Sequence, residues 1–223
     1  MIVVRILLAV LLATCGVNVT AGEVRAVPGD CPPICDRIPD SAWIEATSVP
    51  LYPVYKWPQL AGLAVTAASP RTKLEEECAT PGIPGDPRSY AVAARAVVAQ
   101  PDGQWQLQVQ VMHWRGDAAA GSEAAAIAMR RVRLALRACQ LTAPRTSPSI
   151  TTDQPDRLAA VVSMDGRRVL HQFVVAQPRN STVVELAMWA LTPPAVPWAP
   201  VPDPEIFEAM AAPLCTAYIG SCG

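Results

Sequence analysis

Polar and apolar residues alternate between residues 104 and 114, and a helical pattern follows. Glutamine occupies positions 104, 106, 108 and 110, with apolar residues between them. A period of two with one apolar face predicts a strand that is buried on one side only. Ser122 is expected to be the N-cap of a long helix. Apolar residues then recur every three or four positions up to Cys139, which predicts one buried helical stripe.

The same patterns divide the rest of the chain into a proline-rich part and a part with regular elements. Prolines recur throughout residues 28–87, where they remove backbone donors, so only short helices are expected there, near 39–46 and 72–78. Residues 143–155 are rich in Ser, Thr and Pro, which predicts an exposed loop. The remaining strands are predicted at 90–99, 158–164, 169–177 and 182–191, and the last helix at 203–218.

This order of elements, ββαβββα, predicts an α+β fold. We expect an antiparallel sheet of about five strands, stapled by disulfides, with both main helices packed mostly on one face. The dipeptide at Asp165 and Gly166 is expected to close a hairpin. The predicted organisation is a signal peptide over 1–21, a proline-rich wrap over 22–88 that belongs to the same domain, and an α+β core over 89–223.

The amino terminus has the features of a secretory signal peptide. Arg5 precedes the apolar run 6–13, and a small-x-small pattern ends at Ala21. The run is shorter than the about 20 residues of a membrane-spanning helix. Lipidation of Cys15 is the alternative, because the four residues ending there resemble a bacterial lipobox, although Thr14 departs from that pattern. We therefore expect an exported protein, secreted or associated with the cell envelope, that meets the membrane only through its signal or a lipid anchor.

Cysteine usage agrees with export. Without the signal peptide, an even number of cysteines would remain, which is typical of a disulfide framework. Cys139 lies on the buried stripe, so its bond should join the long helix either to the C-terminal helix or to the loop at Cys78. Two prolines lie between Cys31 and Cys35, which favours a structural role over a redox pair. The six cysteines expected to form disulfides are Cys31, Cys35, Cys78, Cys139, Cys215 and Cys222.

The charge balance and the missing motifs exclude several classes of function. The chain has 18 basic and 19 acidic residues, so it lacks the basic excess of a nucleic-acid-binding protein. The sequence contains no nucleophile elbow, phosphate-binding loop or dinucleotide fingerprint, so we predict no catalytic residue and no cofactor. Arginines at 130, 131, 133 and 137 are expected to form a solvated helix face, with an anionic lipid or an acidic partner as the alternative.

Two histidines could hold a metal. His113 and His171 are both expected at inward-facing positions, on different strands. A zinc site would need at least one further ligand, and no zinc motif is present. We therefore predict that both are hydrogen-bonded core residues, and we predict no metal.

Tryptophans provide the candidate ligand-binding residues. Trp114 leaves the apolar phase and is expected on the glutamine side of its strand, beside Arg115, while Trp189 is expected on the Glu185 side of another strand. An indole in such a place lies either under the proline-rich wrap, where it gains from burial, or in a groove. In a groove, Trp114, Arg115 and Trp189 could bind a sugar ring or an apolar ligand.

Three features together resemble a known family. They are the alanine-rich helix ending at Cys139, the strand segment 182–186, and a C-terminal helix bearing Cys215. Over residues 44–222 this layout is similar to the extracellular sensor domain of the actinobacterial receptor kinase PknH and to secreted or lipid-anchored proteins that share it. The segment with Cys31 and Cys35 departs from that pattern.

The resemblance implies a disulfide-stapled α+β fold with a cleft that binds a ligand at the cell envelope, without enzymatic activity. We expect the cleft between the sheet and the proline-rich wrap. The expected function is a non-catalytic, sensor-like binding module whose partner is a small envelope ligand or an envelope protein. The alternatives are a secreted structural or protein-interaction factor and an exported hydrolase.

Overall fold

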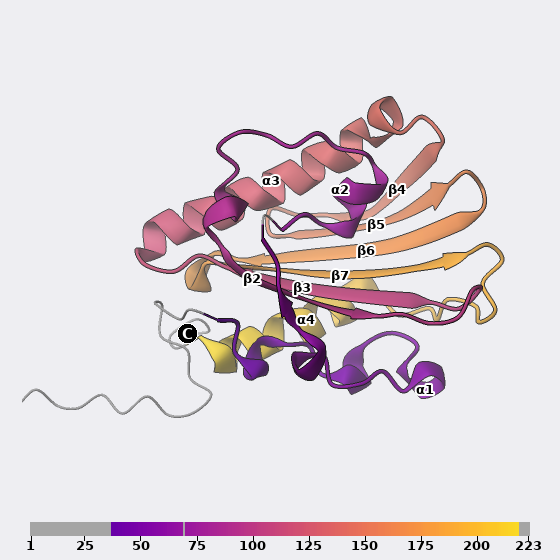
Figure 1. Cartoon of the computed structure of the whole chain (residues 1–223), viewed down its shortest axis with the longest axis horizontal. Coiled ribbons are helices and arrows are strands. Elements are labelled where there is room, and N and C mark those ends of the chain that lie inside the picture. Colours follow the sequence, from indigo (N-terminus) through magenta and orange to yellow (C-terminus); the bar gives the residue numbers. More distant parts are fainter. Residues whose placement is uncertain (1–36, 69, 219–223) are drawn as a thin grey trace, which may run out of the picture.

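A seven-stranded antiparallel sheet is the middle layer of the fold (Figure 1). The computed structural model describes residues 37–68 and 70–218. The strands lie in the order β1-β2-β3-β7-β6-β5-β4. They are β1 (Val65–Thr66), β2 (Val92–Val98), β3 (Gln106–His113), β4 (Thr146–Asp153), β5 (Arg157–Met164), β6 (Arg168–Gln177) and β7 (Thr182–Leu191).

Both edges of the sheet differ from the prediction, so the expected count of about five strands and the order ββαβββα were wrong. The segment predicted as an exposed loop is β4, which pairs with β5. An edge strand needs backbone partners on one side only, so it tolerates the Pro148 that disfavoured a strand in the sequence. The two-residue β1 pairs with β2 at the other edge. The alternation in 104–114 and the periodicity of β5, β6 and β7 predicted the central strands correctly.

The main helices α3 (Ala118–Thr142) and α4 (Asp203–Ala217) lie on opposite faces of the sheet (Figure 1). The prediction that both pack mostly on one face was therefore wrong. The physical reason is that β6 is apolar on both sides: Leu170 and Val174 belong to the core beneath α3, and Phe173 belongs to the core beneath α4. A strand with no polar side has to be covered twice.

The proline-rich segment is divided between the two faces. Its first described part, 37–63, packs beside α4 and contains α1 (Tyr52–Tyr55) and the 3₁₀ helices η1 (Asp40–Ala42), η2 (Ala46–Ser48) and η3 (Ala61–Leu63). Its second part covers the α3 face and contains α2 (Lys73–Glu77) and η4 (Pro87–Tyr90). The expected signal peptide and the residues Cys15, Cys31 and Cys35 lie outside the described residues.

Local signals explain where the elements begin and end. Asp117, and not the expected Ser122, caps α3, since its Oδ1 accepts from the Ala120 amide at 2.8 Å; the alanines before Ser122 extend the helix towards the N-terminus. Thr72 and Glu75 form a capping box at the start of α2. The predicted hairpin at Asp165 is confirmed by a left-handed backbone there and at the following glycine.

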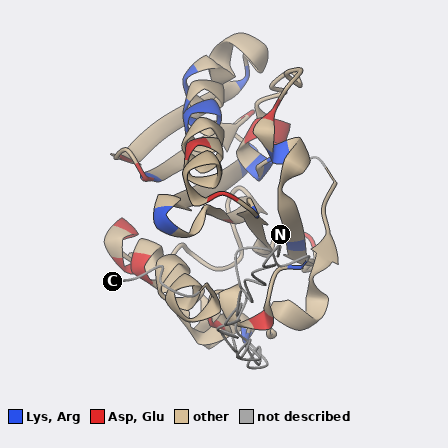
Figure 2. Ribbon diagram, turned by 90° about the vertical axis from the view of Figure 1, so that its left-hand side faces the viewer, with Lys and Arg blue, Asp and Glu red and all other residues tan. Residues whose placement is uncertain are grey.

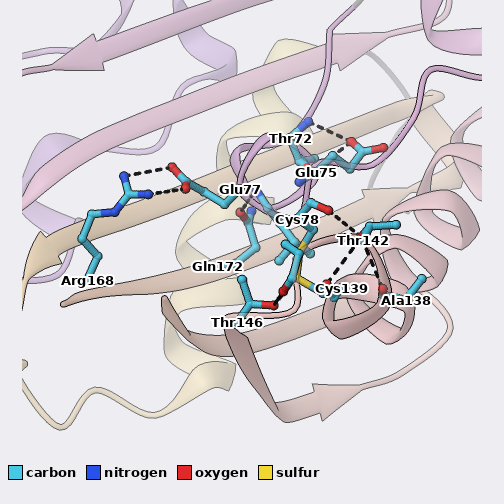
Figure 3. The surroundings of a disulfide bond; sticks show 12 residues. Thr72, Glu75, Glu77, Cys78, Ala138, Cys139, Thr142, Thr146, Arg168 and Gln172 are labelled. Atoms are coloured by element: carbon cyan, nitrogen blue, oxygen red, sulfur yellow. Dashed lines mark hydrogen bonds and ion pairs between the residues drawn. A yellow bond between two sulfur atoms is a disulfide. The ribbon is translucent and has the colours of Figure 1, made fainter. Parts of the chain in front are cut away.

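A disulfide joins Cys78, directly after α2, to Cys139 on α3, with the Cα atoms 4.8 Å apart (Figure 3). It is the second of the two connections expected for Cys139. Cys215 is disulfide-bonded as well, and Cys222 lies outside the described residues. The disulfide indicates an oxidising, non-cytoplasmic environment. Within residues 37–68 and 70–218, the helices include none that is long and apolar enough to span a bilayer.

Candidate functional site

A cavity of about 670 Å³ lies between helix α3 and the loop 80–89 that follows α2. Its volume is in the usual range for small-molecule sites. The expected position was between the sheet and the proline-rich wrap; the wrap forms one wall, but α3 forms the opposite one. The apolar part of the lining consists of Pro70, Pro81, Ile83, Pro84, Leu134, Ala135 and Ala138.

The loop over the cavity is fixed at both ends. At its start the Cys78–Cys139 disulfide ties it to α3, and Thr142 Oγ1 donates a hydrogen bond to the Cys78 carbonyl (Figure 3). At its far end the Trp114 indole donates to the Pro87 carbonyl at 2.8 Å. Prolines and glycines between these points disfavour helix and strand, so the loop spans the gap as irregular chain.

A buried ion network forms the polar side of the cavity. The Arg88 guanidinium contacts both oxygens of Glu75, at 2.5 and 2.8 Å, and both oxygens of Asp86, with the shortest contact at 2.6 Å. Arg88 and Glu75 are almost completely buried. Arg131 on α3 lies 2.8 Å from Asp86 Oδ2, as an ion pair and not as an aligned hydrogen bond. The network therefore connects α2, the loop and α3.

The network keeps Asp86 and Arg88 charged. Burial alone would raise the pKa of Asp86, but the hydrogen bonds and the charge of Arg88 outweigh it and lower that pKa to about 2. The pKa of Arg88 is raised above its usual value, because its two carboxylate partners outweigh its own desolvation. A carboxylate held ionised against a guanidinium is a poor general acid, and it is committed to a structural contact.

Arg71 is a third arginine of the lining and is bonded differently. Its Nη2 donates to the carbonyl of Glu75 at 2.9 Å and to the carbonyl of Thr80. No carboxylate among the described residues forms an ion pair with it. The lining thus contains three arginines and two carboxylates, so its formal charge is +1.

The predicted ligand-binding residues do not come together. Trp114 is 6% exposed and packs in the core beneath α3, Arg115 is exposed, and Trp189 is half-buried with Lys73 Nζ 4.7 Å from its ring centroid. In the register of β3 and β7, His113 faces Thr182 and Gln106 faces Trp189, so the two indoles are about 25 Å apart at about 3.3 Å per residue.

None of these three residues lines the 670 Å³ cavity. Trp114 does lie under the proline-rich segment, which was the first of its two expected fates. Trp189 lines a smaller cavity of about 250 Å³ beside Arg168.

The two histidines are likewise apart. His113 is buried, its Nδ1 lies 3.1 Å from Thr182 Oγ1, and its ring stacks on Tyr218. His171 stacks on Trp198 at 3.8 Å, and burial lowers its pKa to about 4. In the described part of the chain, no three His, Cys, Asp or Glu side chains are grouped as metal ligands would be.

The glutamine side of β3 is covered, which corrects the prediction of a strand buried on one side. Gln108 and Glu185 are buried beneath α2, and Glu185 accepts bonds from the Lys73 amide, from Gln108 and from Gln172. Gln172 Oε1 in turn accepts from the Leu74 amide at 3.1 Å. These bonds satisfy the first amides of α2 and position it over the sheet. Burial raises the pKa of Glu185 to about 7.

Basic residues recur along α3 (Figure 2), but the arginine face that they form is only partly exposed to solvent. Arg133 and Arg137 both bind Asp153 of β4, at 2.5 and 2.8 Å, and Arg131 belongs to the cavity network. Arg130 is exposed as expected. The prediction missed these pairs because β4 was not recognised as a strand.

Sequence reasoning missed Arg71, Glu75, Asp86 and Arg88, and it placed Arg131 on the arginine face of α3 without its partner Asp86. They belong to no motif and are brought together from three segments. One local signal could have drawn attention to them: Thr72 and Glu75 have the spacing of a capping box, which would have placed Glu75 at a fixed position. The pairing with Arg88 follows only from the fold.

Similarity to other proteins does not assign this site. No protein-family model matches the chain, and no curated protein is significantly similar to it. The resemblance to the sensor domain of PknH stays a prediction, and the cavity is interpreted from its own geometry.

Proposed function

We propose that this protein is a non-catalytic binding module of the cell envelope that holds a small ligand in the cavity between α3 and the loop 80–89. The observation that carries the proposal is the form of this cavity: its walls are mostly apolar, and charged groups line one side of it. Ligand sites generally combine these two features, because apolar walls provide burial and a few polar groups provide orientation.

The way in which the loop is held supports a preformed site. The disulfide, the Arg88 network and the Trp114 bond fix the loop independently of any ligand. A site that is already ordered loses less conformational entropy on binding, so it can bind a small molecule more tightly.

The state of the charged groups favours binding over hydrolysis. Glu75 and Asp86 are both committed to Arg88, and the low pKa of Asp86 keeps it from delivering a proton near neutral pH. Export is part of the proposal as well: the disulfide fits an oxidising compartment, and the first 21 residues have the pattern of a signal peptide, with lipidation of Cys15 as the second route.

Native mass spectrometry of the protein purified from its own host tests this function. We expect a reproducible bound mass in the wild type and its loss in Ala138→Phe, which fills the cavity from α3. Leu141→Glu is the matched control, because Leu141 lies on the same helix outside the lining and is exposed, so this variant should keep the ligand. A bound mass that persists in Ala138→Phe would show that the ligand binds elsewhere.

A further inference from the structure

We propose that the ligand is an amphiphile with one negative charge, whose anionic group binds Arg71 and whose apolar chain lies between Ile83 and Leu134. This inference rests on the proposed function, because it uses the same cavity. It adds the chemical class of the ligand and the residue that selects it.

The charge of the lining carries the first step. Arg88 and Arg131 are matched by Glu75 and Asp86 within the network. Arg71 is left with two neutral carbonyl acceptors on one of its nitrogens, and its charge is not matched by a carboxylate among the described residues. A guanidinium presents five donors in a planar fork, so Arg71 can bind a carboxylate or a phosphodiester while it keeps its bonds to the loop.

The balance of charges in the cavity lining also limits the charge of the ligand. One negative charge neutralises the surplus of the lining, whereas a second would have to be buried beside Glu75 and Asp86 without a partner. Burial of an unpaired charge is strongly unfavourable. The site should also reject a ligand with a cationic group, because that charge would be buried unpaired beside a lining that is already positive.

The apolar walls carry the second step. Ile83 is 51% exposed and Leu134 is 64% exposed, and they line the cavity from opposite sides, one from the loop and one from α3. Prolines and alanines cover most of the remaining wall, and these side chains offer a chain of methylenes no hydrogen bonds. The burial of each methylene there contributes about 0.8 kcal/mol, which favours an alkyl chain over a sugar or a nucleotide.

Fluorescence titration with 11-(dansylamino)undecanoic acid, its methyl ester and the corresponding amine tests this inference. We expect the acid to bind at least about 10-fold more tightly than the ester, because a hydrogen bond to a charged partner contributes about 1.5–3 kcal/mol. The amine should bind more weakly than the ester.

Three variants assign the selectivity to Arg71. Arg71→Gln removes the charge and keeps a donor for the loop carbonyls, so it should abolish the preference for the acid over the ester. Arg71→Lys should retain a preference for the acid. Arg137→Gln removes an arginine of the same helix as Arg131 that lies outside the lining, and it should change neither affinity.

The outcomes separate the ligand class from the function. Equal binding of acid and ester in the wild type, with loss of both in Ala138→Phe, would overturn the anionic class and leave the cavity as a binding site. Absence of binding by all three probes, together with no bound mass in the native spectra, would overturn the proposed function itself.

Vesicles of phosphatidylglycerol distinguish a free amphiphile from a lipid headgroup of the same charge in a membrane. We expect wild type and Arg71→Gln to sediment with them to the same extent, because the proposed ligand is one that enters the cavity as a free molecule. Sedimentation that depends on Arg71 would overturn the free ligand in favour of a lipid surface.

Discussion

Both faces of the sheet have apolar cores, but they differ in the polar and covalent contacts that supplement those cores. On the α4 face the core consists of large apolar and aromatic side chains, with Trp105 completely buried and Phe173 edge-on to Phe207 at 6.0 Å. The α3 face also has an apolar core, but there a disulfide, an ion network and a cluster of buried glutamines hold the covering segments in addition.

This difference explains why the cavity described above is found on the α3 face. Apolar packing has no preferred direction, so the segments on the α4 face can settle until the space between them is filled. Hydrogen bonds and a disulfide have fixed lengths and angles, so they hold the loop 80–89 at a set distance from α3. Space can then remain between the two segments, because these contacts offset the packing that is lost there.

The largest loss of stability should come from a substitution in the core of the α4 face. Trp105→Ala removes a completely buried indole and its hydrogen bond to the Val196 carbonyl, so we expect the free energy of unfolding to fall by about 5 kcal/mol. Urea denaturation measures this change. Leu134→Ala is the control on the other face, and because Leu134 is 64% exposed its change should stay within about 0.5 kcal/mol. A small effect of Trp105→Ala would mean that packing does not hold the α4 face.

The second effect concerns the covalent tie of the α3 face. The disulfide joins residues 61 positions apart, and the chain-entropy relation gives a loss of about 4 kcal/mol for Cys78→Ala combined with Cys139→Ala. Urea denaturation of the double variant measures this, and probe titration should show weaker binding as the loop is released. Unchanged probe affinity would contradict the role of the disulfide in setting the cavity.

The third effect is a pH dependence on the α3 face. Glu185 has a pKa of about 7 in the folded protein against 4.5 in the unfolded chain. The folded state therefore retains the proton longer, and stability should fall as pH rises from about 4.5 to 7, by up to about 3 kcal/mol. Glu185→Gln keeps an acceptor for the Lys73 amide and should remove this decline in denaturation series across pH. A variant with the slope of the wild type would show that another group is responsible.

The smallest effect has the opposite sign and lies on the α4 face. His171 has a pKa of about 4 in the folded protein against 6.5 in the unfolded chain, so its contribution to stability is present above pH 6.5 and is lost as pH falls towards 4. Because the ring is partly exposed, we expect about 2 kcal/mol. His171→Phe retains a ring against Trp198 and should make the protein less sensitive to acid. Equal acid sensitivity in both proteins would rule out this role of His171.

The sequence predicted features that depend on local spacing. The long helix ending near Cys139, the strand 182–191 and the hairpin at Asp165 follow from periodicity and turn residues, which neighbouring residues determine. The glutamines of β3 show the limit of such patterns. Their alternation correctly indicated a strand. However, polar residues alternate in the same way whether they face water or the buried end of a helix, so the pattern could not distinguish the two.

The candidate site could not be predicted in the same way. It is formed by residues from α2, from the loop and from α3, and Arg131 lies close to Asp86 only in the folded protein, where Cys78 is also bonded to Cys139. The ββαβββα pattern contained no information about which face each helix would cover. The cleft was therefore predicted between the proline-rich wrap and the sheet, whereas the wall opposite the wrap is helix α3.

The position of the Cys78–Cys139 bond makes the maturation of this protein a sequence of two events. A newly made polypeptide with free thiols lacks the tie that sets the distance between the loop and α3. Oxidation of these thiols then completes the cavity, so the protein should become able to capture the ligand proposed above only in the compartment where the bond forms.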